Sequence, residues 1–277
     1  MCMSFAELFT KKENSKPFID IINHSVVEAK TTTDVEVPLG KSDKLLFTCD
    51  ENKINYSQKN NKYYKKINDA VAYSNTMCNV TSMIMALDYA GFKFPDLGKW
   101  EQPEDAFMDF MLNSKEVDKM YERDYPAMYK DYKAGKKDCY FPNEIHSLLS
   151  YTTNLWLQDE VTKFTTKGKI KKLLWDNLVQ DSLPLVVSGS FPMSSGKRFN
   201  HIVTITGVKY DSLKNGEDST PMQIKIDDPN GNPLKDWTGS GNDIMLDWQF
   251  CVENLKPLNS ENEKWVHYFI KGGAAVI

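Results

Sequence analysis

Apolar residues recur at helical spacing in the stretch that follows Cys78. They stand at positions i, i+3, i+4 and i+7: Val80, Met83, Ile84 and Leu87. This spacing is typical of one buried helix face. It predicts a helix that follows the small polar residues 74–76, which can cap free backbone amides, and that stops at Gly91, where a left-handed conformation is easily adopted. Cys78 is therefore expected in the first turn of a helix.

Further helices are indicated by the distribution of charged and apolar residues. Residues 103–134 combine an apolar face with many charges that would cover the remaining surface, and residues 143–151 suggest a short additional helix. Residues 167–180 place their aliphatic side chains near one face while the lysines lie largely off it. This last pattern predicts an amphipathic helix that ends at Asp181.

Three segments in the second half of the chain are rich in β-branched residues and end in glycine or turn residues: 183–190, 199–208 and 222–228. No helical pattern separates them, so they predict an antiparallel sheet. Residues 242–250 are aromatic and alternate in part, and residues 265–270 predict a closing strand. Because helices come first and strands second, the pattern predicts an α+β fold.

Residues 1–65 differ from the rest of the chain. They contain short β-leaning runs and run into a dense polar tract of asparagine, lysine and tyrosine at 51–66. We expect an N-terminal extension over residues 1–65, either packed on the main domain or forming a loosely ordered arm. The main domain is expected over residues 66–277.

Composition and charge narrow the class of protein. At 277 residues the chain can bury a large core, and its 41% hydrophobic and 26% charged residues are ordinary for a globular protein. A net charge of −4 argues against a nucleic-acid partner that is bound through broad phosphate neutralisation. The sequence has neither a secretory signal pattern nor an apolar stretch long enough for a membrane span. We therefore expect synthesis in a cytoplasm, with delivery to the cell envelope requiring another route, such as a virion.

Cysteine and histidine are few enough to be weighed one by one. Five cysteines are scattered without a Cys-x-x-Cys pair: Cys2, Cys49, Cys78, Cys139 and Cys251. This pattern argues against a zinc ribbon or a disulfide scaffold and leaves room for one functional thiol. We expect neither a metal nor another cofactor. Of the four histidines, His24, His146 and His267 have no chemical partner at a useful spacing, so we assign them to packing or to the surface.

Cys78, His201 and Asp228 together suggest acyl-transfer chemistry. Free amides at a helix N-terminus favour a thiolate and can receive an oxyanion. His201 opens a predicted strand and Asp228 ends another at a Pro-Asn-Gly turn, so a base and its orienting carboxylate are available. Asp227 is the rival of Asp228, and only one can serve because adjacent strand residues point to opposite faces. The alternative interpretation is purely structural: Cys78 would pack in the core, His201 would be a buried histidine, and Asp228 would stabilise a turn.

Four segments strengthen the catalytic interpretation. They occur in the order NTMCNVTSM (75–83), LPLVVSGSF (183–191), NHIVTITG (200–207) and IDDPNGN (226–232). As a set they resemble the C39-like cysteine peptidases over residues 73–235. The resemblance implies a papain-like fold, in which an N-terminal helical half with the cysteine helix packs on a C-terminal antiparallel sheet. It also implies hydrolysis of a peptide or peptide-like amide bond.

The resemblance implies a role for each member of a Cys-His-Asp triad. Cys78 would be the nucleophile that forms a thioester, His201 the general base and acid, and Asp228 the residue that orients the imidazole.

The chain departs from the family pattern at the oxyanion hole. Members commonly have a glutamine shortly before the cysteine as an oxyanion donor, whereas residues 67–77 contain none. Asn75 is the candidate replacement, with Asn68 and Ser74 as weaker candidates. The backbone N–H of Cys78 would remain the second donor.

We therefore expect a cysteine peptidase or amidase, with cell-wall peptides as one candidate substrate. The missing glutamine favours, as the alternative, a weakly active or inactive peptide-binding module on the same fold, since a poor oxyanion hole costs about a hundredfold or more in rate. A transglutaminase-like or deamidating reaction would use the same residues. Residues 1–65 are candidates for assembly into a larger, phage-like particle, and neither a nucleic-acid nor a membrane partner is expected.

Overall fold

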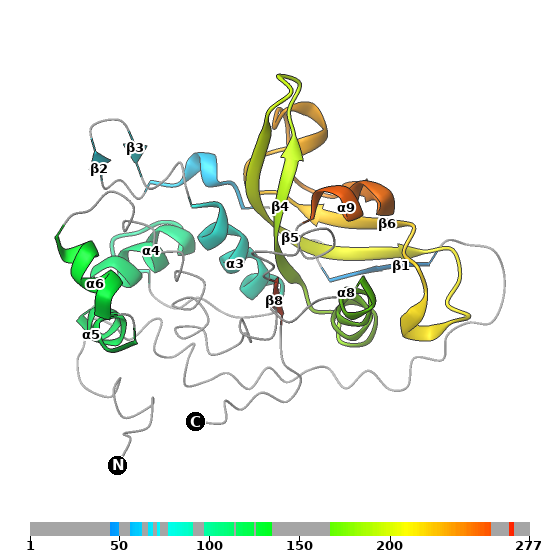
Figure 1. Cartoon of the computed structure of the whole chain (residues 1–277), viewed down its shortest axis with the longest axis horizontal. Coiled ribbons are helices and arrows are strands. Elements are labelled where there is room, and N and C mark those ends of the chain that lie inside the picture. Colours follow the sequence, from blue (N-terminus) through cyan, green and yellow to red (C-terminus); the bar gives the residue numbers. More distant parts are fainter. Residues whose placement is uncertain are drawn as a thin grey trace, which may run out of the picture.

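A computed structural model describes residues 45–49, 56–62, 66–68, 71–72, 77–90, 97–113, 115–124, 126–134, 167–255 and 266–268. These residues form helices and a main antiparallel sheet that curls into a half-barrel, with a small two-stranded hairpin apart from it (Figure 1). The predicted α+β class is confirmed. The short helix predicted at 143–151 lies outside the described residues.

The main sheet has the strand order β7-β6-β5-β4-β8, with β1 paired to β5, and each of these pairings is antiparallel. Its strands are β1 (Leu45–Thr48), β4 (Leu185–Pro192), β5 (Arg198–Tyr210), β6 (Gln223–Asp227), β7 (Ile244–Asp247) and β8 (Val266–Tyr268). The three central strands match the three predicted β segments. They are neighbours because short connections join successive antiparallel strands. The β4–β5 hairpin extends well beyond the other strands (Figure 1).

The described part of the predicted N-terminal extension packs on this body. β1 pairs with the far end of β5, with Leu45 opposite Tyr210. A 3-10 turn, η1 (Gln58–Asn60), follows, and then a small separate hairpin of β2 (Lys66–Asn68) and β3 (Val71–Ala72).

The predicted helical regions are subdivided in the structure. Region 103–134 consists of α4 (Pro103–Asn113), α5 (Lys115–Asp124) and α6 (Pro126–Lys133). Proline is favourable in a first helical turn and disruptive further inside, so Pro126 starts a new helix. The predicted helix 167–180 is α8 (Lys167–Leu174) continued by a π-helix, η5 (Trp175–Gln180), and segment 242–250 divides between β7 and α9 (Trp248–Asn254).

Helix α3 (Cys78–Tyr89) lies between the sheet and α4 (Figure 1). The face predicted from the apolar spacing is buried, and burial goes further than predicted, because every residue from 79 to 87 is buried. One side of the helix packs against Val186 and Ile202 of β4 and β5, and the cluster also includes Phe107 and Met108 of α4. A sheet on one side and another helix on the other leave little of residues 79–87 in contact with water.

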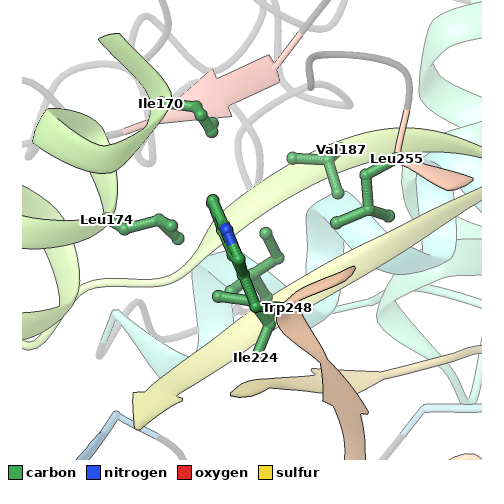
Figure 2. Close-up of a pocket in the computed structure, with 7 residues that line it drawn as sticks. Ile170, Leu174, Val187, Ile224, Trp248 and Leu255 are labelled. Atoms are coloured by element: carbon green, nitrogen blue, oxygen red, sulfur yellow. The ribbon is translucent and has the colours of Figure 1, made fainter. Parts of the chain in front are cut away.

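The opposite face of the sheet carries a second core, in which Val187 and Ile205 alternate with the residues that face α3. Figure 2 shows the indole of Trp248 between Leu174 of α8 on one side and Val187 and Leu255 on the other. A cavity of about 10 Å³ remains there, room for at most about one water molecule. It is a gap in apolar packing and too small for a substrate.

Candidate active site

Cys78 is the first residue of α3, as the apolar spacing predicts. The N-cap residue Met77 is buried and makes no side-chain capping hydrogen bond. The side chain of Asn79 accepts a hydrogen bond from the Val80 N–H at 2.8 Å. Cys78 itself is half-buried, so its sulfur lies at the edge of the core beside the amides of the first helical turn.

His201 and Asp228 form a buried pair at the start of β5 and just after the end of β6. The distance from His201 Nε2 to Asp228 Oδ1 is 2.8 Å, and neither side chain has any exposed surface. The same carboxylate oxygen accepts the backbone N–H of Asn230 at 2.7 Å, while the Asp228 N–H donates to the Gly241 carbonyl at 2.9 Å. The carboxylate is thus held in one orientation by the turn that follows β6.

Cys78 lies close enough to His201 to act on its ionisation. Burial lowers the pKa of His201, but the Asp228 carboxylate and the Cys78 sulfur outweigh burial and raise this pKa from 6.5 to about 10. Because Nε2 faces Asp228, Nδ1 is the ring nitrogen left for the sulfur. Nδ1 is buried and has no hydrogen bond of regular geometry to any described residue. The arrangement favours the imidazolium form of His201.

The two adjacent aspartates point to different places, as strand alternation requires. Asp228 faces His201, whereas Asp227 accepts hydrogen bonds from the Tyr89 hydroxyl at 2.6 Å and from the Asp243 N–H at 2.8 Å. The structure therefore brings Asp228, and not its rival, to the imidazole.

Aromatic rings cover the imidazole. The Phe199 ring lies 5.4 Å from that of His201, and the Trp237 ring lies 6.2 Å from it in an edge-on arrangement at 85°. Trp237 follows Asp236 in a turn where both have left-handed backbones, with φ of 58° and 48°, and its carbonyl accepts a hydrogen bond from Lys59 Nζ at 2.8 Å. The sequence analysis missed Trp237. The turn-rich segment after Asp228, which ends in this large apolar residue, was the available signal.

Gln58 is a second residue that the sequence analysis missed. Its backbone N–H donates to the Pro229 carbonyl at 2.8 Å, next to Asp228, and three residues later Asn61 donates to Thr81 Oγ1 of α3 at 3.0 Å. Gln58 is buried, and its side-chain oxygen has no hydrogen-bond partner among the described residues. The segment that carries it bridges the Asp228 turn and the first turns of α3. The search for an oxyanion donor covered only residues 67–77, directly before the helix. Gln58 comes earlier in the chain, because the β2–β3 hairpin lies between it and the helix.

Most of the remaining predicted residues fall outside the described part of the chain. Asn75, Ser74, His24 and His146 are outside the described residues, as are Cys2 and Cys139. Asn68 ends β2, and His267 lies in β8 opposite Val186.

The other described cysteines have structural surroundings. Cys49 Sγ donates to the Thr206 carbonyl at 3.3 Å. Cys251 is buried, and burial together with nearby Asp247 raises its pKa to about 12. Across the described parts of the chain, no three or more His, Cys, Asp or Glu side chains gather in a way that could hold a metal ion.

Comparisons with protein-family models, with curated proteins and with solved structures find no match for this chain. Among the helices of the described residues, none has the length and apolar character to cross a membrane. A functional assignment therefore depends on the chemistry of the residues that the fold brings together.

Proposed function

We propose that the chain is a cysteine peptidase or amidase with a papain-like architecture, as the resemblance to C39-like peptidases implies. One observation carries the proposal. His201, paired with Asp228 at 2.8 Å, also interacts with Cys78, although the three residues come from distant parts of the chain. A thiol, a base and a buried carboxylate in this order are the components of nucleophilic acyl transfer.

In the proposed reaction His201 Nδ1 already holds the proton that Cys78 has given up, as the raised pKa of His201 allows, and the sulfur attacks the carbonyl carbon of the amide. The Asp228 carboxylate holds the ring through Nε2 and stabilises the imidazolium. The imidazolium then protonates the leaving amine as the C–N bond breaks, which leaves a thioester on Cys78. A water molecule, deprotonated by His201, attacks the thioester, releases the carboxylic acid and restores the thiol.

The negative oxygen formed in both steps needs hydrogen-bond donors. The backbone N–H of Cys78, at the start of α3, is one donor that we propose. We propose the side-chain NH2 group of Gln58 as the other, because its segment bridges the Asp228 turn and α3. Asn75 remains the alternative donor.

The test is incubation of the wild type and of Cys78→Ala with a peptide library and with purified peptidoglycan, read by mass spectrometry. Cys49→Ala is the matched control, because it removes a half-buried thiol away from His201. We expect cleavage by the wild type and by Cys49→Ala, and none by Cys78→Ala. Cleavage by Cys78→Ala would contradict the proposal.

The same experiment separates the alternative functions. Peptide binding without cleavage, unchanged in Cys78→Ala, would indicate a binding module. A change in substrate mass without chain cleavage would indicate deamidation or acyl transfer by the same residues. Cleavage of cell-wall peptides in preference to the library would identify the substrate class.

A further inference from the structure

Helix α3 is attached to the sheet near both of its ends and at its middle. At its first residue, Cys78 interacts with His201 of β5. At its last residue, the Tyr89 hydroxyl donates to Asp227 Oδ2 of β6 at 2.6 Å. Between them, Ser82 Oγ donates to the Ile202 carbonyl and Thr204 Oγ1 donates to the Ser82 carbonyl, each at 3.0 Å. The helix that carries the proposed nucleophile is therefore anchored to β5, which carries His201, and to the last residue of β6, which directly precedes Asp228.

Asp227 links the C-terminal end of α3 to a neighbouring loop through hydrogen bonds to both of its carboxylate oxygens. Its side chain is fully buried, and its second oxygen accepts the Asp243 N–H at 2.8 Å. Asp243 has a left-handed backbone with φ of 55°, and its carboxylate accepts a hydrogen bond from Lys225 Nζ at 2.8 Å. Gly241, two residues earlier, accepts the N–H of Asp228. Asp227 thus fixes both the end of α3 and the loop that holds the backbone of Asp228.

Because Cys78 and Tyr89 lie on opposite sides of Ser82 along α3, a movement of Tyr89 can displace Cys78. Ser82 is four residues from Cys78 and seven from Tyr89, which corresponds to about 6 Å and about 10 Å along a helix. If α3 pivots at Ser82, a displacement of about 1 Å at Tyr89 moves Cys78 by about 0.6 Å. Reaction rates respond strongly to misplacements of this size.

We propose that Tyr89 and Asp227 are positioning residues of the proposed active site: their hydrogen bond prevents α3 from pivoting and keeps Cys78 in register with His201. The inference rests on the proposed function, because it assumes that the contact between Cys78 and His201 is used. It assigns to Asp227 a task different from that of its neighbour Asp228.

The test measures the rate at which iodoacetamide alkylates Cys78 in the full chain between pH 5 and pH 10, with the labelled peptide identified by mass spectrometry. The variant is Tyr89→Phe, which removes the hydroxyl and keeps the ring. Tyr210→Phe is the matched control, since its hydroxyl is also buried and has no hydrogen-bond partner among the described residues. Asp227→Asn is a second variant, because an amide cannot accept from both the Tyr89 hydroxyl and the Asp243 N–H.

We expect Tyr89→Phe and Asp227→Asn to lower the alkylation rate at pH 6 about tenfold and to move the profile to higher pH. Rates should converge with the wild type near pH 10, where the thiolate forms without help from His201. Tyr210→Phe should follow the wild type. Convergence distinguishes lost positioning from blocked access to the sulfur, which would lower the rate at every pH.

A wild-type profile in folded Tyr89→Phe would overturn the inference. So would loss of the folded state in both variants, because the pair would then be structural. Failure of the proposed function gives a different result: His201→Ala would leave the alkylation profile of Cys78 unchanged, whatever Tyr89→Phe does.

Discussion

Replacing Asp228 by asparagine removes the charge that His201 faces and changes the size of the side chain very little. The pair is fully buried, with the two side chains joined at 2.8 Å, so no water can take the place of the lost carboxylate. Once the Asp228 carboxylate is lost, burial disfavours the positive charge on the imidazole. The pKa of His201 should therefore fall from its raised value.

The sign of the effect on stability follows from proton binding. The native chain keeps the His201 proton up to about pH 10, whereas the unfolded chain releases it above about pH 6.5. Between these values the native state binds one more proton, so the contribution of the pair falls by about 1.4 kcal/mol per pH unit as the pH rises. The stabilisation is complete below pH 6.5 and is lost as the pH passes through the native pKa. At neutral pH the substitution should cost about 3–5 kcal/mol, as is typical when one partner of a buried ion pair is removed.

Urea unfolding followed by tryptophan fluorescence between pH 6 and pH 10 measures this effect. The difference in free energy of unfolding between the wild type and Asp228→Asn should shrink steadily across that range. Asp236→Asn is the matched control: Asp236 is exposed, and hydrogen bonds from Ser194 lower its pKa, so its contribution changes only at acidic pH. A constant difference between the wild type and Asp228→Asn from pH 6.5 to pH 10 would refute the reasoning.

Three further predictions follow from the site and its surroundings. Iodoacetamide at pH 7 should label Cys78 ahead of Cys251, since burial raises the pKa of Cys251 to about 12, and equal labelling in a peptide map would contradict this. Gln58→Ala should lower kcat about a hundredfold and leave the labelling of Cys78 unchanged, whereas an unaltered kcat would assign the oxyanion donor elsewhere. Gly241→Ala should lower the free energy of unfolding by about 1–3 kcal/mol in urea, because a Cβ there would overlap the Asp228 carbonyl oxygen. Wild-type stability would show that this loop can shift at little cost.

Several features of the site could be predicted because they depend on local order. Apolar residues at helical spacing located the helix after Cys78, and β-branched runs between turn residues located β4, β5 and β6. Strand alternation showed that only one of Asp227 and Asp228 could face a given partner. The prediction that His201 and Asp228 act with Cys78 in catalysis stays a prediction, although the fold brings the three residues together.

Other features required the tertiary structure. The sequence by itself determined the class of fold and three candidate residues, because hydrophobic periodicity and turn chemistry are properties of neighbouring residues. Only the packed chain decided that residues 79–87 of α3 are all buried, that Trp237 covers the imidazole and that Gln58 lies beside the Asp228 turn. These contacts join segments separated by tens to hundreds of residues. Their geometry is set by how a helix and a curled sheet fill space together, which no local pattern encodes.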